Sequence, residues 1–264
     1  MGKPVLLLRL EGPLQSWGVR SRWDVRDTAT EPTKSGVIGL LGCALGYAMR
    51  DSLLEELDRA LRFGVRVEHA GVVVTDYQTI TDYLPTAAGE WKARGDKRSK
   101  SIDSLHESDA PPATIISPRA YLEDAAFLVA LEAKETGDIV ASCAQAVQNP
   151  QWPLFLGRKA CVSTRPIFEY FGNDYNDIED ALKHRRWEWL GACHQLRRQT
   201  PDGQLAAFIE DENGTLTQQD AMRLNASRTY GFRPVLRAFF TPVLAANVEA
   251  QKTVDIASPA PEVT

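Results

Sequence analysis

Three short segments of the sequence combine glycine or serine with basic side chains in patterns that could bind phosphate. The first is Thr33-Lys34-Ser35-Gly36, which opens a glycine-rich stretch whose apolar residues recur at helical spacing. The N–H groups at the start of a helix, the positive end of the helix dipole and one lysine together favour an anion. The spacing is not that of a P-loop. Taken alone, the segment favours a capped and tightly packed structural helix over an anion site.

The second segment is the basic run from Trp91 to Lys100, which carries five Lys or Arg residues against one Asp. It lies within residues 81–113, a stretch without a convincing apolar period and too long for an ordinary connection. A basic run beside an aromatic residue can follow an RNA backbone while its side chains insert between bases. The alternative interpretation is a solvated charged loop.

The third segment is Leu156-Gly157-Arg158-Lys159, a glycine with two adjacent cations between a predicted helix and a predicted strand. In a sheet that binds RNA, a loop at the edge can reach a phosphate. A polar stretch near the amino terminus, residues 15–32, adds further aromatic and basic residues, namely Trp17, Arg20, Arg22, Trp23 and Arg26.

Patterns typical of catalysis or metal binding do not occur. His184 and the pair Cys193-His194 are too far apart, and lack a fourth ligand, for a zinc site. Neither a Gly-x-Ser-x-Gly elbow nor a His-Glu-x-x-His helix is present. The four cysteines contain no closely spaced pair and are expected to be reduced and buried. The sequence therefore predicts no catalytic residue, no metal and no cofactor.

The elements that must position these segments follow from apolar periodicity and from capping residues. We expect them at residues 5–10 (strand), 33–48 and 51–61 (helices), 63–68 and 72–80 (strands), 119–131 (strand), 138–148 (helix) and 155–162 (loop and strand). This order predicts an α+β fold, a ferredoxin-like, RNA-recognition-motif-like βαββαβ palm. The weaker pattern beyond it predicts a helix at 178–198, a hairpin-like segment at 204–216 and a strand at 230–240.

We expect a palm at 1–166, a carboxyl-terminal subdomain at 167–243 and a flexible tail at 244–264, which is rich in Ala, Pro and Glu. With 264 residues, 44% of them hydrophobic, the chain can bury a core, and no apolar run is long enough for a signal peptide or a membrane span. A cytoplasmic protein follows. The net charge of −5 does not exclude RNA, because a polyanion responds to local patches within a Debye length of about 8 Å.

Four ordered motifs resemble a known family. Two of them, residues 7–18 (LLRLEGPLQSWG) and residues 26–42 (RDT, then PTKSGVIGLLG), are similar to the amino-terminal signature of the CasD family, the handle-binding subunit of the type I-E CRISPR Cascade complex. Residues 121–127 (YLEDAAF) and 153–161 (PLFLGRKAC) are similar to two further motifs of that family. The carboxyl-terminal third matches weakly, and its best fragment is Ser227-Arg228-Thr229-Tyr230.

The resemblance implies a palm whose thumb protrudes between the second and third strands, at about residues 81–113, and grips the 5′ handle of a CRISPR guide RNA. It further implies a ribonucleoprotein for antiviral defence in which this subunit caps one end, touching the large subunit and a backbone subunit. The double-stranded DNA target would then be read through the guide. The residues expected to bind RNA are Gln15, Trp17, Arg20, Arg22, Arg26, Lys34, Ser35, Gly36, Lys92, Arg94, Lys97, Arg98, Lys100, Gly157, Arg158 and Lys159.

Two alternatives accompany this expectation of a non-catalytic RNA-binding scaffold. One is a metal-independent endoribonuclease that processes CRISPR precursor RNA, as the related type I-C subunit does. Such an enzyme needs a base for the 2′-hydroxyl and an acid for the leaving oxygen on one surface. The motifs resemble the subtype in which a separate subunit cuts. The other alternative is an unrelated RNA-binding domain with coincidental motifs.

Overall fold

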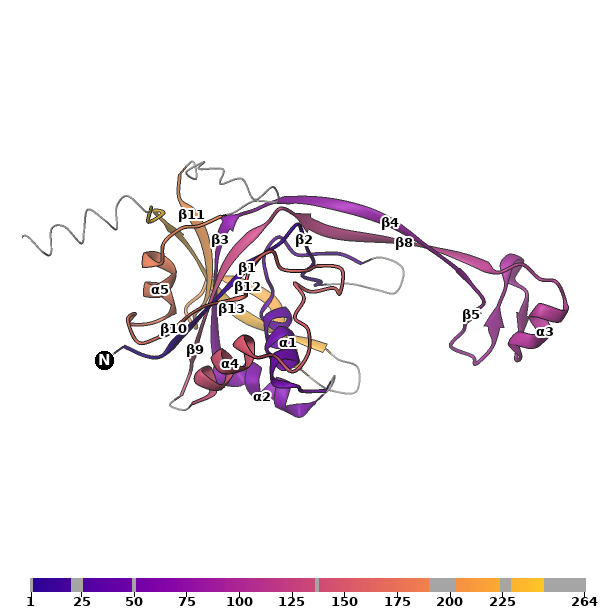
Figure 1. Cartoon of the computed structure of the whole chain (residues 1–264), viewed down its shortest axis with the longest axis horizontal. Helices are drawn as coiled ribbons and strands as arrows, with labels where there is room; N and C mark the ends of the chain where they lie inside the picture. The colour runs from indigo at the N-terminus through magenta and orange to yellow at the C-terminus, as the bar shows by residue number, and fades with distance from the viewer. Residues whose placement is uncertain are drawn as a thin grey trace, which may run out of the picture.

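A computed structural model describes residues 2–19, 26–48, 51–135, 138–189, 203–223 and 229–244. Figure 1 shows a body built around one large sheet, from which a long two-stranded ribbon projects and ends in a small lobe. Within these residues, no helix is long and apolar enough to cross a membrane.

The described residues of the body form a mixed α/β architecture on an antiparallel sheet of seven strands, ordered β10-β1-β9-β3-β11-β13-β12. The strands are β1 Val5–Glu11, β3 Leu61–His69, β9 Ala126–Ala133, β10 Phe168–Gly172, β11 Leu205–Glu210, β12 Leu216–Arg223 and β13 Thr229–Phe240. Every residue of β1 is buried, as its nearly continuous apolar run predicts for a central strand.

Both faces of the sheet are covered. The helices α1 (Lys34–Leu45), α2 (Ser52–Ala60) and α4 (Ile139–Gln148) pack against one face. The helix α5 (Ile178–His184) packs against the other. Alternate residues of β1 point to the two sides, so Leu6 joins the α1 side and Leu7 the α5 side.

Capping residues determine where α1 begins and ends. Thr33 has extended backbone angles, and its hydroxyl accepts a hydrogen bond from the Gly36 N–H, which is the N-cap expected from the sequence. Gly46 ends the helix with φ of +80°. A Cβ at Gly42 would lie 2.3 Å from the Leu54 side chain of α2, so this glycine permits close helix packing, whereas Gly39 faces open space.

The projecting ribbon consists of β4 (Val72–Asp82) and β8 (Ala113–Glu123), which pair along their whole length. The short strand β2 (Leu14–Gln15) pairs with the base of β8. The lobe at residues 83–112 contains β5 Leu84–Pro85, β6 Trp91–Lys92, the 3-10 turn Arg94–Asp96, β7 Arg98–Ser99 and α3 Ile102–Glu107. Its small core is formed by Ala93, Leu105 and Ala110. We call β4, β8 and this lobe the thumb.

Several sequence expectations need correction. Residues 155–162 form no strand; the edge position beside β1 belongs to β10 instead. The strand expected at 119–131 is two strands, because Asp124 adopts a left-handed backbone with φ of +56° between β8 and β9. The segment 81–113 is not without structure, since its small apolar residues support a compact lobe.

The carboxyl-terminal region also differs from expectation. The helix expected at 178–198 ends at His184, and residues 190–202 lie outside the described part of the chain. The segment 204–216 is not a hairpin, because β11 and β12 each pair with β13 rather than with one another. β10, β11 and β13 share the sheet of β1, and the division at residue 166 stays a prediction. The tail expected at 244–264 lies outside the described residues after Leu244.

Candidate functional site

Two of the three candidate phosphate-binding segments meet at one pocket of about 530 Å³, which we call the α1 pocket. It lies between the turn after β2, the start of α1 and the loop after residue 156. Its lining residues are Ser16, Trp17, Gly18, Val19, Arg26, Thr33, Ser35, Gly36, Gly157, Arg158 and Tyr230. The remaining segment, the basic run at residues 91–100, lies in the thumb lobe, well separated from the body (Figure 1).

A tight loop brings Gly157 against the turn after β2. Gly157 has φ of +99°, and a Cβ there would lie 1.8 Å from the carbonyl oxygen of Ser16. The Ser16 N–H donates to the Leu156 carbonyl at 3.0 Å, and the Leu156 N–H donates to the Cys161 carbonyl at 2.8 Å. Only glycine fits this position, because any side chain would collide with backbone.

Arg158 uses its guanidinium within the protein. Its Nη1 donates to the Ala120 carbonyl at 3.0 Å, and its Nη2 donates to the carbonyls of Arg26 and Asp27, each at 3.1 Å. The guanidinium carbon lies 4.6 Å from the ring centroid of Tyr121, a cation–π contact. Arg26 itself is exposed at the α1 pocket.

The backbone donors at the start of α1 are largely occupied. The Lys34 N–H donates to a carboxylate oxygen of Asp220 at 2.7 Å, and the Gly36 N–H donates to the Thr33 hydroxyl. Within the described residues, the Ser35 N–H is the donor at this end that has no acceptor. An anion at this helix start would therefore be held by the amide and hydroxyl of Ser35.

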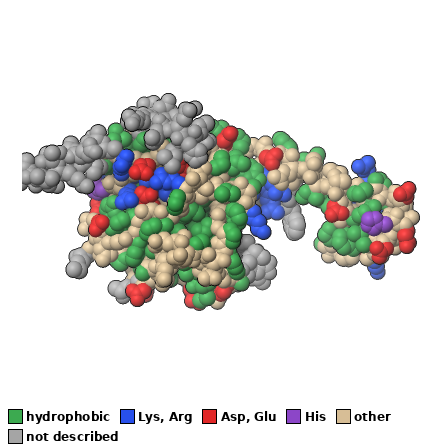
Figure 2. Space-filling view, in the orientation of Figure 1, with side chains coloured by type: hydrophobic (Ala, Val, Ile, Leu, Met, Phe, Trp, Pro, Cys, Tyr) green, Lys and Arg blue, Asp and Glu red, His purple; other side chains and the backbone are tan. Residues whose placement is uncertain are grey.

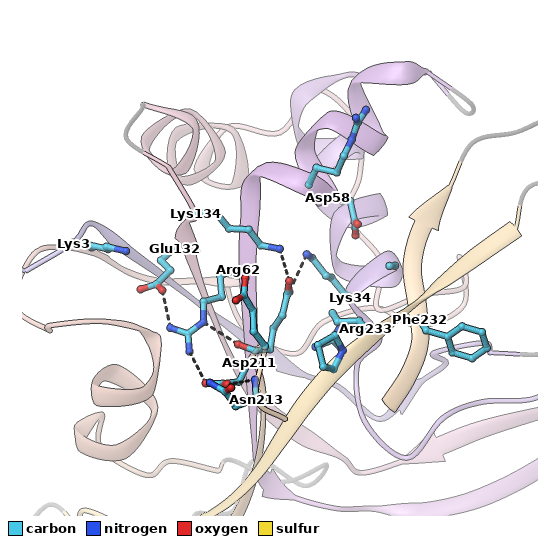
Figure 3. Close-up of a pocket in the computed structure, with 15 residues that line it drawn as sticks. Lys3, Lys34, Asp58, Arg62, Glu132, Lys134, Asp211, Asn213, Phe232 and Arg233 are labelled. Carbon is cyan, nitrogen blue, oxygen red and sulfur yellow. Dashed lines mark hydrogen bonds and ion pairs between the residues drawn. The ribbon is translucent and has the colours of Figure 1, made fainter. Parts of the chain in front are cut away.

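The Lys34 ammonium does not face the α1 pocket. It is buried and donates to the Leu61 carbonyl at 2.8 Å and to Glu210 at 2.9 Å. Lys34 and Lys134 both form ion pairs with Glu210, in a separate pocket of about 690 Å³. Figure 3 shows the two lysines pointing to one carboxylate. Burial lowers the pKa of Lys34, although Asp58 and Glu210 act in the opposite direction. The expectation that Lys34 binds RNA phosphate conflicts with this geometry.

Gln15 and Trp17 also conflict with the expectation of direct RNA contact. Gln15 is fully buried, and its amide donates to the carbonyls of Leu10 and Ala125. Its oxygen accepts the Trp17 indole N–H at 3.0 Å, and Trp17 is 1% exposed beneath Gly36. Gln15 therefore packs beneath the pocket, and Trp17 lines its floor with almost no exposed surface. Arg20 and Arg22 lie outside the described residues.

The basic run of the thumb lobe is largely exposed, and one acidic residue, Asp96, lies among its cations. Arg94, Lys97, Arg98 and Lys100 are exposed. Lys92 forms an ion pair with Asp96, and its hydrogen bond and charge lower the pKa of that carboxyl. Figure 2 shows side chains of both signs on the lobe.

Sequence reasoning missed two features of the site. Tyr230, on β13, lines the α1 pocket. Asp220 caps the start of α1 and is held by Arg233 through two hydrogen bonds of 3.0 and 2.9 Å. Both features come from the carboxyl-terminal strands, and no local spacing around α1 could have indicated them.

Comparison with known proteins finds relatives in sequence and in fold. A family model described as CRISPR-associated protein (Cas_Cas5) matches residues 5–236. The CRISPR system Cascade subunit CasD of Escherichia coli (strain K12) is 33% identical over 169 residues, which are 62% of this chain and 69% of CasD. A crystal structure of a Cas protein superposes with a TM-score of 0.60 at 32% identity, covering 89% of this chain and 94% of that one. A chain of a CRISPR RNA-guided surveillance complex superposes with a TM-score of 0.63 at 26% identity, covering 96% of this chain and 100% of that one.

The fold is thus that of a CRISPR-associated protein. The family match extends over most of the sheet, the thumb and both loops of the α1 pocket. The chain belongs to the Cas5 family, and the resemblance to CasD noted in its sequence motifs is confirmed.

Proposed function

We propose that this chain is the non-catalytic RNA-binding subunit of a type I-E Cascade surveillance complex, holding the 5′ handle of the guide RNA and capping one end of the complex. The relative CasD is a Cascade subunit by name, and one similar solved chain belongs to an RNA-guided surveillance complex. The observation that carries the proposal is the α1 pocket, where a tight glycine loop, a helix start and the exposed Arg26 converge.

The strand order supports a ferredoxin-like palm within the larger sheet. The four strands of a βαββαβ unit correspond, in chain order, to β1, β3, β9 and β10. In the sheet they lie in the order β10-β1-β9-β3. Helices α1 and α2 lie between the first two strands, and α4 lies between the last two. The thumb leaves this unit between β3 and β9, where the family resemblance expects it.

The proposed RNA-binding residues form two groups. At and beside the α1 pocket they are Arg26, Ser35, Gly36, Gly157 and Lys159, with Arg158 holding the neighbouring backbone; in the thumb they are Lys92, Arg94, Lys97, Arg98 and Lys100. Gln15, Trp17 and Lys34 would contribute by supporting α1 and its neighbouring turn. Partners touching the rest of the surface would be the backbone subunit and the large subunit, with the DNA target engaged through the guide.

Binding of handle RNA tests the proposal. We expect the wild-type chain to bind a fluorescent RNA carrying the repeat-derived handle more tightly than one of equal length with a scrambled handle. Arg26→Ala should weaken this binding, whereas Arg59→Ala, an exposed cation on α2, should not. Equal affinity for the two RNAs would contradict handle recognition.

A further inference from the structure

We infer that Arg158 is a positioning residue that holds residues 26–29, here called the strap, so that Arg26 is presented to the RNA, and that Arg158 does not itself bind phosphate. This inference rests on the proposed function. The observation behind it is that Arg158 donates three hydrogen bonds to backbone carbonyls, one in β8 and two in the strap.

Arg158 has little left with which to bind a phosphate. An arginine recognises phosphate best with the two parallel N–H bonds of its fork. Here both terminal nitrogens are occupied by the carbonyls of Ala120, Arg26 and Asp27, and the Tyr121 ring lies over the guanidinium. Turning Arg158 toward RNA would break these three hydrogen bonds and the stacking on Tyr121.

Among the described residues, backbone hydrogen bonds at its two ends and the side chains of Asp27 and Thr28 also attach the strap. The Arg26 N–H donates to the Pro118 carbonyl at 3.0 Å, and the Ala120 N–H donates to the Arg26 carbonyl at 2.7 Å. At its other end, the Ala29 N–H donates to the Trp17 carbonyl at 2.6 Å. Arg158 joins the strap to β8 between these attachments, because the Arg26 carbonyl accepts from both Ala120 and Arg158.

The side chain that this arrangement leaves for RNA is that of Arg26. Arg26 is exposed, lines the α1 pocket and makes no side-chain hydrogen bond or ion pair within the described residues. Its backbone is fixed by β8 and by Arg158, so little ordering remains to be done when a phosphate binds. Arg158 therefore positions the strap, whereas Arg26 supplies the positive charge for a phosphate.

Arg158→Lys separates the two roles. Lysine keeps the charge and can hold a phosphate as a point charge, but it cannot bridge three carbonyls or stack as a planar group. In the protein without RNA, we expect Arg158→Lys to speed hydrogen exchange at the amides of Arg26 and Ala120, while exchange in β1 stays unchanged. Lys159→Ala, which removes the neighbouring exposed cation, should leave both strap amides as in the wild type.

Salt dependence of handle-RNA binding supplies the second readout. Arg158→Lys and Arg26→Ala should each lower the log–log slope by about 0.7, and the double variant should fall no further. Adding Lys159→Ala to Arg26→Ala should lower the slope again. Wild-type binding by Arg158→Lys, unchanged strap amides, or a further fall in the double variant would each overturn the inference. If the wild type failed to bind handle RNA, the proposed function would fall, and the exchange experiment would still decide whether Arg158 holds the strap.

Discussion

The carboxylate of Asp220 accepts a hydrogen bond 2.7 Å long from the backbone N–H of Lys34, 186 positions earlier in the chain. Arg233 holds the same carboxylate, and both Asp220 and Arg233 are nearly fully buried. The start of α1, which borders the α1 pocket, is therefore fixed by the carboxyl-terminal strands β12 and β13. The shape of the pocket depends on a region where sequence motifs carried little information.

Asp220→Ala should be strongly destabilising. The substitution removes the cap on α1 and leaves the Arg233 guanidinium buried without its carboxylate, which typically costs about 3–5 kcal/mol. Urea unfolding followed by circular dichroism measures the change. Glu107→Gln, at an exposed position of α3, is the control and should stay within about 0.5 kcal/mol of the wild type. A similarly small effect of Asp220→Ala would show that the Asp220 carboxylate does not hold the start of α1.

Gly157→Ala should lower stability by more than the positive φ of residue 157 alone explains, and should disturb the α1 pocket. Gly157 and Gly89 both have positive φ, +99° and +75°, but a Cβ at 157 meets the Ser16 carbonyl whereas one at 89 meets nothing within 4 Å. Gly89→Ala should cost about 1 kcal/mol, the strain of a left-handed residue, and Gly157→Ala should cost more. Handle-RNA affinity should fall for Gly157→Ala alone. Equal losses in the two variants would contradict the close contact with Ser16.

Glu210 should make folding stability sensitive to acid. Burial acts to raise the pKa of Glu210, but Lys34 and Lys134 outweigh it and hold the pKa below the ordinary value of 4.5. Because the folded-state pKa is depressed, the ionised carboxylate contributes stability that is present above about pH 4.5 and is lost as pH falls through the folded-state pKa. We expect the difference in unfolding free energy between the wild type and Glu210→Gln to shrink as the pH falls from about 4.5 through the folded-state pKa. Urea unfolding at several pH values measures this difference. A difference independent of pH would exclude this coupling.

What the sequence could predict was local. The Thr33 cap, the continuous apolar run of β1 and the long strands of the thumb each depend on neighbouring residues, and the structure contains them. The loop at Gly157 and the start of α1, two of the segments that the sequence suggests for phosphate binding, both line the α1 pocket. The burial of Lys34 could not be predicted from its own segment, because its carboxylate partner, Glu210, lies on a strand from the carboxyl-terminal region.

The thumb run should contribute to RNA binding unequally. Replacing Lys92, Arg94, Lys97, Arg98 and Lys100 together by alanine should flatten the salt dependence of handle binding, by about 0.7 in slope for each lost phosphate contact. Lys92 is already paired with Asp96, whereas Arg98 is exposed, so Lys92→Ala should change the slope less than Arg98→Ala. Fluorescence titrations at several salt concentrations measure both slopes. An unchanged slope in the fivefold variant would mean that the thumb lobe is a solvated surface.

The chain should not cut precursor repeat RNA. The one histidine of the thumb, His106, lies edge-on to Tyr83 with ring centroids 4.6 Å apart, which makes this pair the obvious acid and base for the alternative endoribonuclease. The Tyr83 hydroxyl, however, donates to the Ala110 carbonyl at 2.8 Å and helps close the lobe core, so its proton is committed to the fold. Incubation with precursor RNA in EDTA and in Mg²⁺, resolved on a denaturing gel, should show intact RNA in both lanes. A specific cut that disappears in His106→Ala or Tyr83→Phe would replace the scaffold with the endoribonuclease, whereas degradation that persists in both variants would come from a contaminant.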